Sequence, residues 1–374
     1  MSFVVSVRHS SNQMTLGQLL IIGFDGTEMS PRLSSLLTRI QPAGVILFAR
    51  NIANAEQTYR LLKECRACVS TPLFASVDLE GGLVDRFREA IGPTPSAADV
   101  FATGNRRLFR KHGKIIGESC RMLGFNVNFS PVLDLAFEAS RTVMRSRAVS
   151  ADPKQVVAYA SEFLAGLRAR GVVGCGKHFP GLGEANLDTH HELPSVTKAW
   201  KKLWKEDLYP YCALRRQLPM ILVGHANYPE ITRDASPASL SKKWVSDILR
   251  ARIGFRGLIV SDDLEMGGVL KAAPIEQATV EFIRAGGDLA LLCHKEGSIL
   301  RSYEALTKEA ERDHKFARRA KESAARVLAF KRKSPEMNRR TPAPKVEKVE
   351  QLSRRLWEFG EQVRIEALER QVEL

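Results

Sequence analysis

The hydrophobic residues of the chain form two alternating patterns. Short continuous apolar runs rich in Val, Ile and Leu are typical of strands buried on both faces. Between them lie longer segments with an apolar residue every three or four positions, and this spacing predicts amphipathic helices. The apolar runs occupy residues 16–24, 44–49, 72–78, 126–132, 171–176, 219–225, 257–262 and 288–293, and the helical segments occupy residues 31–40, 53–69, 105–123, 153–169, 196–217, 241–252 and 275–285.

Eight strand–helix units within about 330 residues predict an α/β protein with a TIM-type (β/α)8 barrel. A doubly wound sheet of similar length is the alternative. We expect residues 1–333 to form the barrel as a single catalytic domain, and residues 334–348, with three prolines, to form a linker. Residues 349–374 predict one more amphipathic helix that packs on the barrel through Leu352, Leu356, Phe359 and Val363.

The composition is that of a globular protein. With 374 residues, 44% of them hydrophobic and 26% charged, the chain can bury a large core. It contains no apolar run long enough to span a membrane, and the polar residues within 1–14 argue against a secretory signal, so we expect a cytoplasmic protein. The six cysteines are expected to be reduced, and Cys65-x-x-Cys68 has no second ligand pair that would indicate a zinc site.

The net charge of +14 raises the question of a nucleic-acid partner. Residues 301–333 hold 11 Lys and Arg against 5 Asp and Glu, on what we expect to be the outer face of long helices. Aromatic residues are not interleaved with these cations, as they are in proteins that bind single strands. We therefore expect the charge to confer solubility or to attract anionic partners, with no nucleic-acid partner. As its oligomeric state, we favour a monomer.

Polar side chains gather at the carboxyl ends of the predicted strands, which a barrel brings together in one mouth. They are Asp78 and Glu80 on the third strand, Lys177 and His178 on the fifth, His225 on the sixth, and Asp262 and Asp263 on the seventh.

A loop after the fifth strand adds Asp188-Thr189-His190. An Asp two residues before a His makes a plausible acid/base dyad, because the carboxylate can fix the imidazole tautomer; a solvated polar turn is the alternative. A carboxylate on one strand and a proton-transferring loop on another suit a two-step displacement at an acetal carbon. Metal binding is the rival interpretation, but the ligand spacing is not tight and Lys177 would repel a metal, so we expect neither a metal nor another cofactor.

These residues carry a family resemblance. The segment Lys177-His178-Phe179-Pro180-Gly181-x-Gly183, continued by Asp188-Thr189-His190, resembles the signature of bacterial β-N-acetylglucosaminidases of glycoside hydrolase family 3. The match covers most of residues 15–330, and it extends to Asp78-Leu79-Glu80-Gly81-Gly82, Arg86-Phe87, Arg147 with Asp152-Pro153, and Ser261-Asp262.

The resemblance implies a retaining exo-acting hydrolase that removes β-linked N-acetylglucosamine from peptidoglycan fragments during cell-wall recycling. It implies that Asp262 is the nucleophile and that His190, oriented by Asp188, is the acid/base. The residues that it implies for binding the sugar hydroxyls are Asp78, Arg86, Arg147, Lys177 and His178.

The chain departs from the family pattern at three positions. Leu83 stands where an Arg is usual, Leu182 where a His is frequent, and Val149 where an aromatic residue is usual. We expect altered loop packing there and not loss of activity. Two other functions stay open, namely a β-glucosidase-like enzyme for sugars without the acetamide and an inactive sugar-binding barrel. The intact Asp188-Thr189-His190 loop argues against the first, and the two intact catalytic roles argue against the second.

Overall fold

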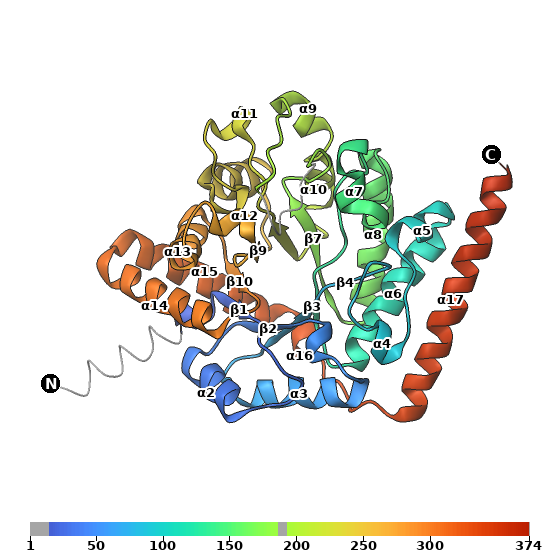
Figure 1. Ribbon diagram of the computed structural model, residues 1–374, viewed down its shortest axis with the longest axis horizontal. Helices are drawn as coiled ribbons and strands as arrows, with labels where there is room; N and C mark the ends of the chain where they lie inside the picture. The colour runs from blue at the N-terminus through green and yellow to red at the C-terminus, as the bar shows by residue number, and fades with distance from the viewer. Residues whose placement is uncertain (1–14, 186–192, 374) are drawn as a thin grey trace.

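The strands of the protein close into a parallel barrel, so the predicted TIM-type fold is confirmed (Figure 1). The computed structural model describes residues 15–185 and 193–373, and Asp188 and His190 lie outside this part of the chain. Around the barrel the strands are β1 (Leu20–Ile22), β2 (Gly44–Leu47), β3 (Phe74–Val77), β6 (Val127–Asn128), β7 (Val173–Phe179), β8 (Met220–Val223), β9 (Leu258–Asp263) and β10 (Leu289–Leu292), which pairs with β1.

Helices surround the strands (Figure 1). The main ones are α2 (Pro31–Ile40), α3 (Ala55–Ala67), α6 (Arg106–Met122), α8 (Pro153–Ala169), α9 (Trp200–Lys205), α10 (Tyr209–Leu214), the π-helix η5 (Lys243–Arg252), α13 (Ile275–Ala285), α14 (Glu296–Arg312) and α15 (His314–Lys333). The predicted bounds of α2, α8 and α13 agree with the structure. In α8 the Asp152 side chain caps the first turn by accepting from the backbone N–H of Lys154.

Both faces of the strands are buried, which explains why their sequences are continuously apolar. In β8, Met220 and Leu222 pack inside the barrel with Phe74 and Val260. The alternate residues Ile221 and Val223 join the layer beneath the helices. This two-sided burial is the usual state of parallel strands covered by helices.

Three local features differ from the predictions. The first strand is shorter than residues 16–24, because residues 15–17 form a helical turn before β1. The segment 196–217 is two helices, and Pro210 stands in the first turn of the second, where its missing N–H costs least. A hairpin of β4 (Leu79–Gly81) and β5 (Val84–Asp85) follows β3, and Gly81 and Gly82 turn it with φ of 87° and 60°.

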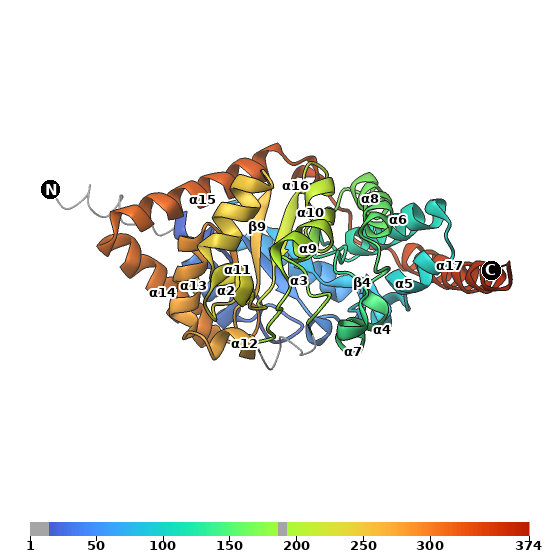
Figure 2. The same ribbon diagram turned by 90° about the horizontal axis from the view of Figure 1, so that it is seen from above.

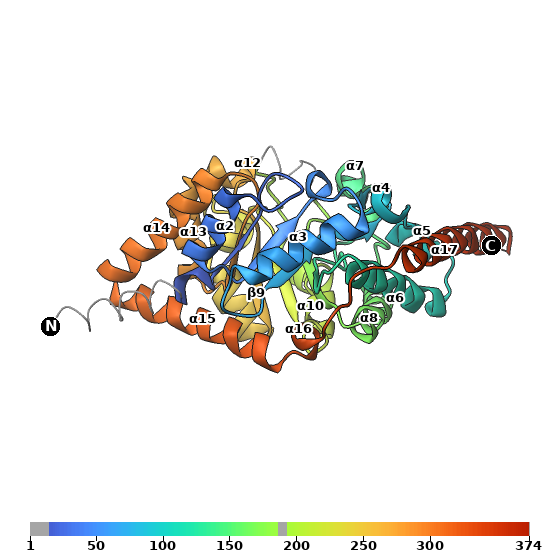
Figure 3. The same ribbon diagram turned by 90° about the horizontal axis from the view of Figure 1, so that it is seen from below.

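Short elements complete the loops. They are α4 (Arg88–Ile91), α5 (Ala97–Ala102), α7 (Arg141–Met144), α11 (Pro229–Thr232), α12 (Gly267–Leu270), and the 3₁₀ turns η1 (Ala49–Asn51), η2 (Glu138–Ser140), η3 (Arg145–Arg147) and η4 (Ala238–Leu240). In Figure 2 the loops that carry α7 and α12 lie at one end of the barrel, and Figure 3 shows the same from below.

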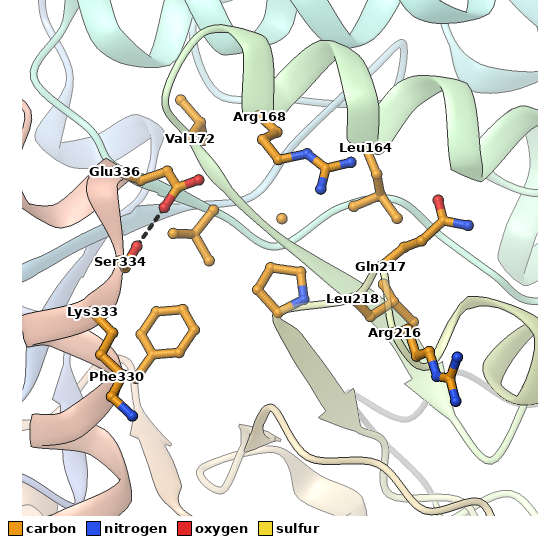
Figure 4. A pocket seen from close by; sticks show the side chains of 13 residues that line it. Leu164, Arg168, Val172, Arg216, Gln217, Leu218, Phe330, Lys333, Ser334 and Glu336 are labelled. Atoms are coloured by element: carbon orange, nitrogen blue, oxygen red, sulfur yellow. Dashed lines mark hydrogen bonds between the residues drawn. The ribbon is translucent and has the colours of Figure 1, made fainter.

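The C-terminal segment crosses the opposite end of the barrel. The predicted linker, residues 334–348, contains the short helix α16 (Pro335–Asn338), and α17 (Val346–Glu373) begins within it. A cavity of about 370 Å³ lies beside α16. The side chains of Leu164 and Arg168 on α8 line one side of it, and Phe330 lines the opposite side (Figure 4). The apolar face of α17 is buried through Leu352, Leu356, Phe359 and Val363. Of the helices described, none combines the length and apolar character needed to cross a membrane.

Lys331 near the end of α15 is fully buried beneath the barrel. Its Nζ donates to Gln18 Oε1 at 2.8 Å and lies 5.0 Å from the centre of the Phe74 ring. No carboxylate among the described residues pairs with it, and burial lowers the pKa of Lys331 to about 7.

This burial predicts a pH-dependent stability. The folded pKa of Lys331 lies below its unfolded value, so the unfolded chain binds more protons between about pH 7 and pH 10, and stability rises with pH there. Lys331→Met removes this term. Between roughly pH 7.5 and pH 9.5, the free energy of unfolding of the native protein should rise by about 2 kcal/mol relative to that of the variant. Urea unfolding of both proteins at these two pH values tests the prediction. The same change of stability with pH in both proteins would contradict it.

Candidate active site

Lys177 and two carboxylates form the centre of the barrel mouth. Lys177 lies on β7 and is buried, and its Nζ contacts Asp78 Oδ1 at 2.6 Å and Glu80 Oε1 at 2.7 Å. Asp78 directly follows β3, and Glu80 lies on β4. The structure thus joins the predicted polar ends of the third and fifth strands.

Arg147 closes this cluster from the loop after β6. Its Nε and Nη2 donate to the two oxygens of Glu80 at 2.8 and 2.9 Å, a bidentate pair that fixes the guanidinium plane. Burial alone would raise the pKa of Glu80, but Arg147 and Lys177 outweigh it and hold that pKa well below its usual range. We call Asp78, Glu80, Arg147 and Lys177 the mouth network.

His178 is oriented by a residue that the sequence analysis did not identify. Asp134 is buried, and its Oδ2 lies 2.7 Å from His178 Nδ1 and accepts from the His178 backbone N–H at 3.1 Å. Its Oδ1 accepts from the backbone N–H of Leu182 at 2.7 Å. The Nδ1–H of His178 therefore faces Asp134, and Nε2 lies toward Arg147 at 3.4 Å. The available signal was a single charge within the apolar run 132–136.

The adjacent acids Asp262 and Asp263 have different environments at the end of β9. Asp262 Oδ1 accepts from the Asp263 backbone N–H at 2.9 Å. Burial would raise the pKa of Asp262, but nearby His178 and His225, with this hydrogen bond and Lys177, lower it. The Asp262 carboxylate is thus kept ionised at neutral pH.

Asp263 is engaged in the turn that follows β9. Its Oδ1 accepts from the backbone N–H of Glu265 at 3.0 Å and of Cys293 at 3.3 Å. Its Oδ2 lies 3.2 Å from His294 Nε2. These contacts give Asp263 a structural position. Burial lowers the pKa of His225, and the charges of both Asp262 and Asp263 oppose this effect.

His225 forms part of the buried wall next to this acid. Its Nε2 donates to the carbonyl of Asp263 at 2.9 Å, and its Nδ1 accepts from Ser239 Oγ at 2.8 Å. Burial lowers its pKa, which favours the neutral ring. Both ring nitrogens are thus committed to protein partners.

Arg86 lies near the mouth beyond the β4–β5 hairpin. Its guanidinium carbon is 5.8 Å from the centre of the Phe48 ring, which also stacks on His294 at 5.6 Å. Within the described part of the chain, Arg86 Nε is buried without a hydrogen-bond partner. A buried donor without a partner is rare and suits a position that a ligand satisfies.

A buried ion cluster joins the two sides of residues 186–192. Lys198 Nζ contacts Glu184 at 3.2 Å and Asp207 at 2.6 Å, and its side chain is inaccessible to solvent. Burial raises the pKa of Asp207 to about 6, partly offset by Lys198. Glu184 and Lys198, which precede and follow residues 186–192, are therefore held together.

No group of three or more His, Cys, Asp or Glu residues in 15–185 and 193–373 is arranged to hold a metal ion.

Comparison with known proteins places this mouth in a family. Residues 12–330 match the model of the glycosyl hydrolase family 3 N-terminal domain. The chain belongs to glycosyl hydrolase family 3. It is therefore a glycoside hydrolase, and the predicted family and enzyme class are confirmed.

Curated relatives and solved structures support this assignment. The beta-hexosaminidase of Idiomarina loihiensis is 36% identical over 279 residues, 74% of this chain and 83% of its own length. The beta-hexosaminidase of Bordetella avium is 38% identical over 260 residues, 67% of this chain and 73% of its own length. The structure of a family 3 beta-N-acetylglucosaminidase from Paenibacillus sp. superposes with a TM-score of 0.86 and 29% identity, over 93% of this chain and 68% of that one.

The mouth network generates a stability prediction. Glu80→Gln leaves Lys177 and Arg147 buried with one carboxylate fewer, so the free energy of unfolding at neutral pH should fall by about 3 kcal/mol. Because the folded pKa of Glu80 is depressed, its contribution is present above about pH 4 and is lost as the pH falls.

Urea unfolding at neutral and at acidic pH measures this, and the difference between native protein and variant should shrink in acid. Glu138→Gln is the matched control, because Glu138 pairs with Arg141 on the open surface, and it should leave stability unchanged. Equal effects of the two substitutions would contradict the role of the mouth network.

Proposed function

We propose that the protein is a retaining exo-β-N-acetylglucosaminidase that removes terminal β-linked N-acetylglucosamine from peptidoglycan fragments. The observation that carries the proposal is the ionised Asp262 beside the mouth network, in a family 3 chain similar to enzymes named beta-hexosaminidases. The cell-wall substrate and a cytoplasmic site of action belong to the proposal. The cell-wall substrate is supported by the resemblance of the Lys177–His190 segment to the bacterial enzymes.

In the first step Asp262 attacks the anomeric carbon. A bond forms between a carboxylate oxygen and this carbon while the bond to the aglycone oxygen breaks, which gives a covalent glycosyl-enzyme. The lowered pKa of Asp262 keeps the attacking oxygen unprotonated. Its Oδ1 is held by the Asp263 N–H, which orients Oδ2 for attack.

His190 is the proposed acid/base, with Asp188 as its orienting partner. In the first step it gives its proton to the departing aglycone oxygen, and in the second it takes a proton from the water that releases the sugar. An imidazole titrates near neutral pH without burial, which suits both transfers. The Glu184–Lys198 ion pair supports this proposal, because it joins the residues that precede and follow this segment.

Five residues are proposed to bind the sugar. The charged groups of the mouth network supply donors and acceptors that are already fixed by one another, and the unpartnered Arg86 Nε adds a donor. Nε2 of His178 is turned toward the same space by Asp134. The residues are Asp78, Arg86, Arg147, Lys177 and His178.

A substrate panel with an Asp262 variant tests the reaction. Purified protein without added metal should release nitrophenol from an aryl β-N-acetylglucosaminide much faster than from an aryl β-glucoside. Asp262→Ala should abolish turnover on both, because the proposed nucleophile is lost. Asp263→Asn is the control and should retain turnover, since that residue is engaged in the turn after β9.

The alternatives give different results in this assay. Preference for the glucoside would support a β-glucosidase-like enzyme, and sugar binding without any turnover would support a sugar-binding barrel. Appreciable residual rate in Asp262→Ala would mean that another carboxylate attacks. Mass spectrometry after reaction with a slow fluorinated sugar substrate should find one sugar residue on the peptide that contains Asp262.

A leaving-group series tests the acid/base role. His190→Ala should slow substrates with poor leaving groups by about a hundredfold, because proton donation matters most when departure is difficult. Substrates with good leaving groups should lose much less. His191→Ala is the matched control and should behave as the native enzyme. An equal loss of rate on substrates with good and with poor leaving groups would show that His190 is not the acid/base.

A further inference from the structure

A second cavity, lined by several charged residues, lies at the end of the barrel opposite the active-site mouth. It has a volume of about 210 Å³ and sits between the C-terminal ends of α6 and α8 and the segment that follows α16. Figures 2 and 3 both place α16 at the end away from α7 and α12. The residues that line the cavity are Glu118, Arg121, Arg170, Arg339, Arg340, Thr341 and Pro342.

The cavity is lined by more positively charged than negatively charged side chains. Four of the lining residues are arginines, and Glu118 is the single lining carboxylate among the described residues. Glu118 is shared, because it lies 3.4 Å from Arg170 Nη2 and also pairs with Arg355. Burial, together with the charges of Arg339 and Arg66, lowers the pKa of Arg121 to about 10, so the guanidinium groups feel one another.

The C-terminal segment is fixed in place over the barrel. Arg121 Nη2 donates to the carbonyl of Arg339 at 2.6 Å, and Tyr59 Oη donates to the carbonyl of Thr341 at 2.9 Å. The Arg339 side chain lies against Gly171, where an added Cβ would come within 2.9 Å of its Cδ. The backbone that carries Arg339 and Arg340 is thus held close to Arg121 and Arg170, so less of the chain has to be ordered when a ligand binds.

Helix capping explains only part of this cluster. Arg121 satisfies a carbonyl, and Arg170 has an ion pair with Glu118. Arg339 and Arg340 have no side-chain hydrogen bond or ion pair within the described part of the chain, yet their segment carries them to the cavity. Both lie beyond residue 330, where the match to the family model ends.

We propose that this arginine cavity binds a small phosphate-type oxyanion, as inorganic phosphate or as the phosphate group of a small metabolite. Guanidinium groups bind phosphate oxygens with paired charge-assisted hydrogen bonds, and several converging arginines suit a divalent tetrahedral anion. The cavity volume fits one such group. The neighbouring cavity of about 370 Å³ beside Phe330 is lined by two arginines, Arg168 and Arg216, and so lacks this concentration of arginines (Figure 4).

Titration calorimetry with sodium phosphate tests the proposal. The full-length chain is used near neutral pH, with sodium chloride holding the ionic strength constant so that general screening does not change. Saturable binding of one phosphate per chain is expected. Arg340→Gln should weaken it about tenfold or more, because a charged donor is lost, while the fold is retained since Arg340 makes no contact that the fold needs.

Arg107→Gln is the matched control, because Arg107 is exposed at the opposite end of α6, and it should bind phosphate as the native chain does. Absence of saturable binding, or the same affinity in Arg340→Gln, would overturn the proposal. The proposal would also be overturned if the protein sedimented with phosphatidylglycerol vesicles but did not bind inorganic phosphate. That result would indicate that the arginines bind a membrane surface. Glycosidase activity should be unchanged in Arg340→Gln, so this test is independent of the proposed function.

Discussion

The active-site mouth depends on the neutralisation of one buried ammonium group. An isolated charge as deep as Lys177 would be prohibitively costly, and the chain surrounds it with Asp78 and Glu80. Glu80 in turn binds Arg147, so four charges from three separate segments balance in one network. Because Glu80 belongs to the β4–β5 hairpin, the same network fixes the hairpin over the barrel and thereby sets the position of Arg86.

The network also prepares the site before a substrate arrives. Lys177 and His178 are neighbours on β7, yet each is held by its own carboxylates: Lys177 by the acids of the mouth network and His178 by Asp134. The histidine rings in turn keep the pKa of Asp262 low. Donors and acceptors fixed in this way need little reorganisation when charge develops during a reaction, which is the main source of electrostatic catalysis.

The sequence predicted what depends on local patterns and missed what depends on tertiary contacts. Continuous apolar runs revealed all eight barrel strands, and Pro153 after its Asp152 cap revealed the start of α8. The β4–β5 hairpin escaped because its strands are two and three residues long. Asp134 escaped because its role appears only when the loop after β6 meets His178, 44 residues later in the chain. Most predicted polar strand ends do meet in one mouth, but Asp263 and His225 are committed to protein contacts.

Charged side chains are balanced differently at the two ends of the barrel, because the strands all run in the same direction. At the mouth, side chains from strands and βα loops converge, and each buried cation has an acid beside it. The opposite end receives helix C-termini, whose partial negative charge favours cations such as Arg121 and Arg170 at the ends of α6 and α8. The arginines there outnumber the acids, because Glu118 is shared between Arg170 and Arg355. Such a surplus of positive charge suits the proposed anion site.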